Sequence, residues 1–270
     1  MITTKEELIV RWDTFLNKIE QRFDDILEQA QQGTTHLVSQ IEYDSGSIGS
    51  AWSGIKGQLY ELREKADHTW ENKMDGLFGD RDDVTSKERI EQFNKYEDLS
   101  HRMENRYNEA QVKAMADAGR KIYDNVMQHI NTNKIHNCKQ CGDQMDIVVY
   151  SFMAKNIKCH SCGTVNSYEP DPRIQALEHY TIGALADEHV IDLVIKEANL
   201  EHDIHRLHDL RNEIGTEEKK NDLRKILVTT RQERIRQYYE FMETNVPDKA
   251  SYYARQKEER LKWAENTKHN

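Results

Sequence analysis

Hydrophobic residues recur at helical spacing along most of the chain. The first two stripes consist of Leu8, Trp12, Phe15, Ile19, Phe23, Ile26 and Ala30, and of Ile48, Trp52, Ile55, Leu59, Leu62, Ala66 and Trp70. Steps of three and four residues place such side chains on one face of an α-helix. The sequence therefore predicts two amphipathic helices, with Gly33 and two threonines ending the first. A loop rich in Gly and Asp, at 75–83, follows the second.

A third stripe is much longer. Thr85 and Glu88 have the spacing of a capping box, and apolar residues then recur in steps of three and four to about Asn131. A continuous helix of about 45 residues would be roughly 68 Å long. Because helices of this length are stable when they pair, we predict a mainly α fold of long antiparallel hairpins, packed as a coiled-coil-like bundle.

The remainder of the chain is predicted to be helical apart from one cysteine-containing segment. The helical pattern resumes at Asp171 and Pro172, an N-cap followed by proline in the first helical position, and Gly215 stops it. A further helix is expected at 220–244, before a break at Pro247. We therefore predict an N-terminal helical region at 1–133, the cysteine segment at 134–170, and a C-terminal helical region at 171–245 that packs on the N-terminal one. A basic, aromatic tail at 246–270 completes the prediction.

Composition and charge narrow the class of protein. The chain is 37% hydrophobic and 32% charged, which suits helices with thin apolar stripes. The formal net charge of -10 argues against general affinity for nucleic acid. The mean hydropathy is -0.91, no apolar run approaches the roughly 18 residues of a membrane span, and the N-terminus lacks the apolar region of a signal peptide. We expect a soluble, cytoplasmic protein.

The four cysteines carry the clearest chemical signal. They form two Cys-x-x-Cys pairs, each followed by glycine: Cys138, Cys141, Cys159 and Cys162. Two thiolates separated by two residues can hold a tetrahedral ion at about 2.3 Å, and a left-handed glycine frees backbone N–H groups to point at the sulfurs. A secreted disulfide scaffold would be smaller and would spread its cysteines more widely. The sequence predicts one structural zinc ion, Zn(2+), bound by all four thiolates.

Three short segments around the cysteines have strand composition, namely Met145–Tyr150, Asn156–Lys158 and Thr164–Tyr168. With the cysteine spacing, they make residues 135–170 resemble the four-cysteine zinc ribbons. The resemblance implies two knuckles and a small antiparallel sheet around one structural zinc. It identifies a module and not a role, because such ribbons occur in transcription and translation factors, in enzymes and in docking modules.

Other site hypotheses have less support. A redox dithiol lacks the βαβ context of such motifs, and a catalytic zinc would need an open coordination position. His136 and His160 are interpreted as spectators of the four-cysteine site. The histidines at 202, 205 and 208 are interpreted as surface residues, since a di-iron site would need Glu-x-x-His on inward faces and the chain contains none.

Partner contacts are expected at the ribbon and at the helices. The ribbon has a formal charge near zero, and Phe152 and Met153, at the expected turn between its strands, are the candidates for docking onto another protein. From Lys219 to Lys268 there are 13 Lys and Arg against 8 Asp and Glu, interleaved with aromatic residues. This tail could stack nucleic-acid bases, but it suits packing on the chain's own bundle or on a protein partner better.

We therefore expect a non-enzymatic scaffold or adaptor in a larger assembly, with a protein partner and no membrane contact. The helical faces would also allow copies of the chain to form a homo-oligomer. One alternative is a nucleic-acid-associated factor that uses the ribbon and the basic tail. A second is a metal-dependent enzyme that uses the histidine-rich helix.

Overall fold

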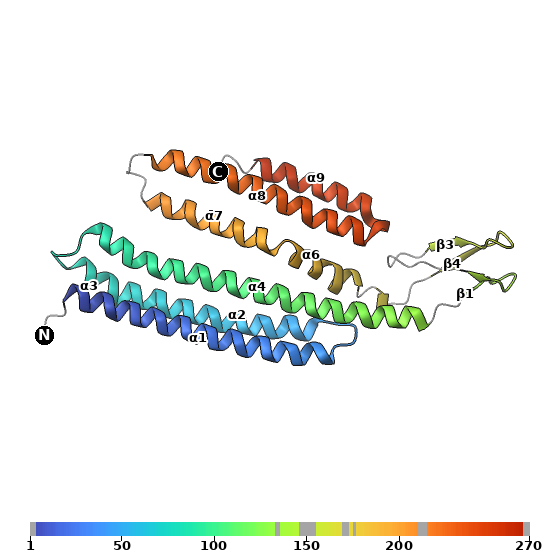
Figure 1. The fold of residues 1–270 in the computed structure, drawn as a ribbon, viewed down its shortest axis with the longest axis horizontal. Coiled ribbons are helices and arrows are strands. Elements are labelled where there is room, and N and C mark those ends of the chain that lie inside the picture. The colour runs from blue at the N-terminus through green and yellow to red at the C-terminus, as the bar shows by residue number, and fades with distance from the viewer. Residues whose placement is uncertain are drawn as a thin grey trace. The chain divides into compact units, whose positions relative to one another are not determined.

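Helices dominate the computed structural model, which describes residues 4–132, 136–145, 155–168, 173–174, 177–209 and 215–266. Two small antiparallel strand pairs interrupt the helical chain, so the prediction of a mainly α fold with a small inserted β region is confirmed (Figure 1). The chain divides into two compact units, Met1–His36 with Ser47–Gln111, and Leu37–Gly46 with Val112–Asn270.

The first unit is built from three helices that run up, down and up. They are α1 (Lys5–Gln40), α2 (Gly46–Thr69) and the first part of α4 (Ser86–Thr132). Ion pairs join Lys5 to Glu88, Asp13 to Lys95, and Asp24 to Arg106, so residue numbers rise together and α1 runs parallel to α4. Between α2 and α4, Arg63 pairs with Glu104 while the Tyr107 hydroxyl donates to the carbonyl of Trp52, so these helices are antiparallel.

The predicted apolar stripes meet in the core of this unit. Trp12, Phe23 and Trp52 are at most 1% exposed. The indole N–H of Trp12 donates to the carbonyl of Gln92 at 2.9 Å, and that of Trp52 donates to the Thr34 hydroxyl at 3.0 Å. Trp12 and Trp52 therefore each join two helices through a hydrogen bond as well as through apolar contact, which meets the need of a buried N–H for a partner.

Two predicted boundaries in this unit are wrong. The first helix does not end at Gly33 but continues to Gln40, because the Thr34 hydroxyl donates to the Ala30 carbonyl within the helix. The loop predicted at 75–83 is helical in its first half. After a π-helix, η1 (Trp70–Met74), Asp75–Gly79 forms α3, in which the buried Phe78 stacks on Trp70 with ring centroids 6.0 Å apart.

Other local predictions are confirmed. The amide of Thr85 donates to the Glu88 carboxylate at 2.8 Å, and the amide of Glu88 donates back to the Thr85 hydroxyl at 3.2 Å. This reciprocal pair is the predicted capping box at the start of α4. Helix α4 is 47 residues long and continuous to Thr132, as the third stripe predicts.

In the second unit, the end of α4 runs antiparallel to the segment that follows the strands. That segment contains η2 (Leu177–Ile182), α6 (Gly183–His189) and α7 (Ile191–Asp209). The Thr181 hydroxyl donates to the carbonyl of Gly119, and Arg120 pairs with Glu188. Further along α4, Ile122 and Val126 pack with Ile174. Later residues of α4 therefore contact earlier residues of the second segment, as expected for an antiparallel pair. The helical segments before and after the cysteine segment therefore run in opposite directions.

A close contact of this pair lies at Gly119. A Cβ atom there would stand 3.2 Å from both the Thr181 Cα and the Tyr180 carbonyl oxygen, which are backbone atoms. Thr181 itself is fully buried. Any larger side chain at Gly119 would separate α4 from η2.

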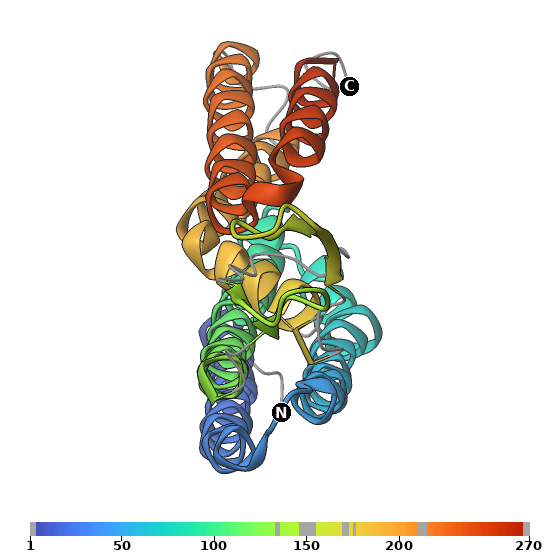
Figure 2. The ribbon, with the colours of Figure 1, turned by 90° about the vertical axis from the view of Figure 1, so that its right-hand side faces the viewer.

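The C-terminal part of this unit forms an antiparallel series of helices. They are α7, α8 (Thr216–Asn245), a 3-10 turn at Pro247–Lys249, and α9 (Ala250–Asn266). Figure 2 shows α8 and α9 side by side, and the two helices are in contact. The Arg234 guanidinium donates to the buried Glu197 of α7 at 2.7 Å, and Arg231 contacts the same carboxylate. The basic tail is therefore a helix that packs on α8.

The helix predicted from Pro172 to Gly215 is divided in the structure. Val190 is a buried turn residue between α6 and α7, and its amide donates to the Asp187 carbonyl at 3.3 Å. Gly215 has a left-handed φ of +84° and is the N-cap residue of α8, whereas residues 210–214, where the predicted end of the preceding helix falls, lie outside the described residues. Over the described part of the chain, no helix combines the length and the apolar character needed to cross a lipid bilayer.

Candidate metal centre

Two six-residue turns of the same geometry carry the cysteines. In the first knuckle (138–143), the Cys138 amide donates to the Asp143 carbonyl at 2.7 Å and the Gly142 amide to the Cys138 carbonyl at 2.9 Å. In the second knuckle (159–164), the equivalent bonds measure 2.8 Å and 3.0 Å. Gly142 and Gly163 have φ values of +77° and +73°, so the expectation that glycine takes the left-handed conformation after each second cysteine is confirmed.

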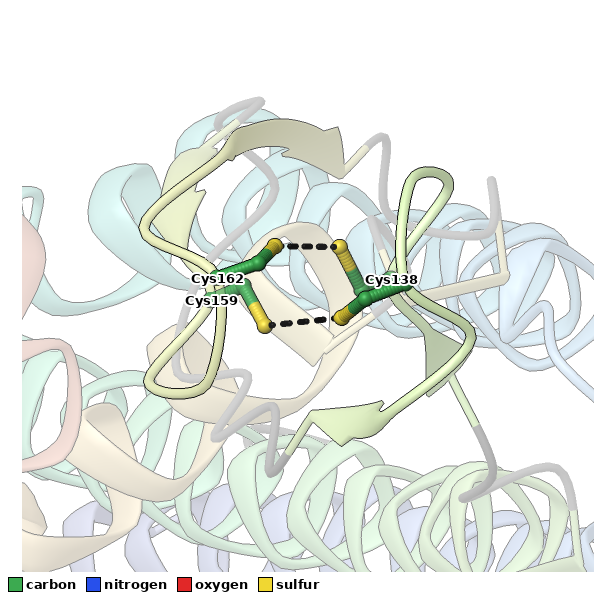
Figure 3. A group of neighbouring side chains, drawn as sticks. Cys138, Cys159 and Cys162 are labelled. Atoms are coloured by element: carbon green, nitrogen blue, oxygen red, sulfur yellow. Dashed lines mark hydrogen bonds between the residues drawn. The ribbon is translucent and has the colours of Figure 1, made fainter.

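The four sulfur atoms converge. Cys138 Sγ lies 3.5 Å from Cys162 Sγ, Cys141 Sγ lies 3.7 Å from Cys159 Sγ, and all four are within 4.8 Å of one another. Figure 3 shows the sulfurs of the two knuckles facing one another. Cys138 and Cys159 are buried, whereas Cys141 and Cys162 are exposed. The cluster is the size of a tetrahedral thiolate site, and the cysteines are positioned to bind a metal ion.

Short strands hold the knuckles. Strand β1 (His136–Asn137) pairs with β2 (Gln144–Met145), and β3 (Lys155–Lys158) pairs with β4 (Val165–Tyr168), both antiparallel. The strands expected at Asn156–Lys158 and Thr164–Tyr168 are confirmed. Of the strand expected at Met145–Tyr150, only Met145 lies within the described residues. Its side chain is buried against Cys138 and Cys159.

Two side-chain hydrogen bonds join the knuckles at equivalent positions. The Ser161 hydroxyl donates to the Asp143 carboxylate, and the Thr164 hydroxyl donates to Gln140 Oε1 at 2.8 Å. Each bond links the third residue of one knuckle to the sixth residue of the other. The sequence analysis missed these four residues. The signal that could have found them is the alignment of the two knuckles on their cysteines.

Asn166 is the other residue that the sequence analysis missed. It is only 3% exposed. Its Oδ1 accepts from the Lys139 amide at 3.0 Å, and its Nδ2 donates to the Thr164 carbonyl at 3.1 Å and to Cys138 Sγ at 3.5 Å. A side chain from the second half of the module therefore contacts both the backbone and a sulfur of the first knuckle.

The hydrogen bonds to sulfur set the pKa values of the thiols. The backbone amides of Cys141 and Gln140, together with Asn166, lower the pKa of Cys138 to about 6. The hydroxyl and amide of Thr164 lower the pKa of Cys162. The Asp143 amide lowers the pKa of Cys141, but the neighbouring sulfurs and desolvation raise it overall to about 12. Four thiolates this close repel one another, so a cation at their centre would be strongly favoured.

The two histidines interpreted as spectators lie within the described residues, whereas the two predicted docking residues do not. The His136 ring meets Tyr168 edge-on at 4.8 Å, and His160 Nε2 lies 3.2 Å from Asp143 Oδ2 with its side chain 73% exposed. Among the described residues, the four cysteines are the one group of His, Cys, Asp and Glu side chains arranged to hold a metal, and no histidine belongs to it. Phe152 and Met153 lie outside the described residues.

Comparisons of the chain with models of known protein families, with curated proteins and with solved structures found no match. The site is therefore defined by its own geometry, as a module inserted in a mainly α-helical chain whose four cysteines are positioned to bind a metal ion.

Proposed function

We propose that Cys138, Cys141, Cys159 and Cys162 bind one structural zinc ion, and that the protein is a non-enzymatic scaffold or adaptor. The observation that carries the metal proposal is the convergence of four sulfurs within 4.8 Å, from two knuckles of the same geometry. Soft thiolate ligands in a tetrahedral set suit zinc. Four protein ligands would also complete its coordination and leave no position for a substrate or water, which supports a structural role.

The scaffold proposal is supported by the construction of the chain. Long helices provide extended surfaces, and several large apolar side chains on them are exposed, among them Val10 at 62% and Tyr60 at 58%. A ribbon stabilised by a metal can present side chains to a partner without a large core of its own. We propose that Phe152 and Met153 supply that contact and that helical faces supply the remainder.

Nucleic-acid binding has less support than protein docking. Arg231 and Arg234 in the basic C-terminal region contact Glu197, and Lys257 contacts Glu243 at 2.9 Å. Cations that are already paired contribute less to a phosphate-binding surface. Binding of duplex or single-stranded nucleic acid that weakens steeply with salt would support this alternative instead.

Partner capture from the native host tests the scaffold proposal. The wild-type chain and the double variant Phe152→Asp with Met153→Asp are purified under identical conditions, and co-purifying proteins are identified by mass. We expect the double variant to keep its zinc and lose a stoichiometric partner. The double variant Gln29→Glu with Gln31→Glu is the matched control, because it adds the same two negative charges at exposed polar positions of α1. Retention of every partner by the double variant would contradict docking through the ribbon.

A further inference from the structure

The two knuckles are followed by buried side chains of different chemistry. Met145 stands seven residues after Cys138, and Asn166 stands seven residues after Cys159, with exposures of 5% and 3%. A methionine side chain has no hydrogen-bond donor, whereas the amide of asparagine has two. The pseudo-symmetry of the module is therefore broken at this buried pair of positions, where the second half supplies the first knuckle with an amide donor and the first half supplies the second knuckle with a thioether.

The contacts of Asn166 account for its burial. Oδ1 accepts from the Lys139 amide, which belongs to the turn between Cys138 and Cys141, and Nδ2 divides its two protons between the Thr164 carbonyl and Cys138 Sγ. The opposite orientation of the amide would set Oδ1 against a carbonyl oxygen and a sulfur, both acceptors. The surrounding groups therefore fix which atom faces the sulfur.

Asn166 lies on β4, which pairs with β3 over four residue pairs. It connects the second half of the module to the backbone and the buried sulfur of the first half.

We propose that Asn166 is a positioning residue of the metal centre, which holds the first knuckle in ligating geometry and stabilises the metal-bound thiolate of Cys138. The proposal rests on the proposed zinc site. Four thiolates and one dication leave a net charge of about -2, and a buried charge is costly without hydrogen bonds to it. Cys138 is 3% exposed, so water has little access to its sulfur and the Asn166 amide takes the place of a water donor.

The variant Asn166→Asp tests this role with almost no change in shape. One carboxylate oxygen can still accept from the Lys139 amide, but the other replaces the N–H donor to sulfur with an acceptor. We expect its zinc affinity, measured by competition with a chromophoric chelator, to fall about 10- to 100-fold, which is typical of lost outer-shell partners. The cobalt-substituted variant should keep the absorption of a four-thiolate site, because all four ligands remain.

Gln140→Ala is the matched control. It removes the hydrogen bond from Thr164 between the knuckles but no bond to sulfur, and Gln140 is exposed. We expect its loss of zinc affinity to stay below about tenfold. Equal losses in both variants would show that any contact between the knuckles suffices, and would overturn the specific role of Asn166.

A measurement on the wild-type chain avoids dependence on the folding of a variant. In the cadmium-loaded protein, the side-chain amide protons of Asn166 should show a scalar coupling to the cadmium nucleus through the hydrogen bond to Cys138 Sγ. Asn166 protons without this coupling, or an Asn166→Asp variant that binds zinc as tightly as wild type, would overturn the positioning role and leave the zinc site intact. A wild-type chain that binds no zinc through its cysteines would overturn the site itself.

Discussion

The three-helix unit and the cysteine module are stabilised in different ways. In the first unit, fully buried aromatic and aliphatic side chains from three helices fill a continuous core, with Trp12, Phe23 and Trp52 at its centre. In the described part of the cysteine module, the buried apolar cluster consists of Cys138, Met145 and Cys159. A segment of this length can bury little apolar surface on its own, and its sulfur cluster and hydrogen bonds provide another source of stability if a metal is bound. The two regions should therefore respond oppositely to metal removal and to core mutation.

Loss of the metal should give the largest effect, confined to the cysteine module. Structural zinc contributes apparent binding free energies of about 10–16 kcal/mol in small metal-dependent modules, so Cys159→Ser should disorder the knuckles. The helices have cores of their own, and far-UV circular dichroism should retain most of its helical amplitude. Global unfolding of Cys159→Ser would mean that the module is needed for the helices to fold.

A core mutation in the first unit should have the reverse effect. Trp52 is fully buried, and Trp52→Ala should reduce the free energy of unfolding by about 3–5 kcal/mol while leaving zinc stoichiometry unchanged. Tyr60→Ala is the matched control, because Tyr60 lies on the same helix and is 58% exposed. It should change stability by less than about 0.5 kcal/mol. Loss of zinc from Trp52→Ala would contradict the independence of the two regions.

Gly119 offers a smaller test, at the contact between α4 and η2. Gly119→Ala would set its methyl group 3.2 Å from two backbone atoms, and we expect a loss of about 1–3 kcal/mol in urea unfolding. Gly57→Ala in α2 has no neighbouring atom within 4 Å and should stabilise the helix by up to about 1 kcal/mol. Stabilisation by both substitutions would mean that α4 and η2 can separate without a loss in the free energy of unfolding.

The smallest expected effect depends on pH. The hydrogen bond from Lys5 and the two from Thr85 lower the pKa of Glu88 from 4.5 to about 2. Because the pKa is lower in the folded state, the stabilisation is present above pH 4.5 and is lost as the pH falls toward 2. In thermal melts, the difference in Tm between wild type and Glu88→Gln should shrink over this interval. A Tm difference that stays constant with pH would show that the charged form of the Glu88 carboxylate does not stabilise the folded state.

The sequence predicted most of the helices because their apolar stripes are what the cores bury. The errors lie where a local signal competes with packing. Gly33 and its threonines indicated a helix end, but the Thr34 hydroxyl is satisfied by the Ala30 carbonyl and by Trp52, so the helix continues. Phe78 in a segment rich in Gly and Asp was overlooked, although its burial against Trp70 keeps that segment helical. The contact of Thr34 with Trp52 joins two different helices, and that of Phe78 with Trp70 joins two different elements, so neither follows from the pattern within one helix.

In the candidate site, too, the sequence predicted the residues that follow a local pattern and not those that depend on packing. The spacing of the cysteines predicted the cluster, because ligands in paired turns follow a local rule. Asn166 follows no such rule, since an asparagine in a short strand has the pattern of an exposed polar residue, and its burial depends on the partner knuckle. Only the comparison of equivalent positions, Met145 against Asn166, carries a hint of its role.

X-ray absorption at the zinc edge, on protein purified without added metal, would decide whether the four cysteines bind zinc. We expect about one zinc per chain, surrounded by four sulfur ligands at about 2.3 Å. Protein without zinc, iron in its place, or a zinc ion with nitrogen or oxygen ligands would contradict this expectation.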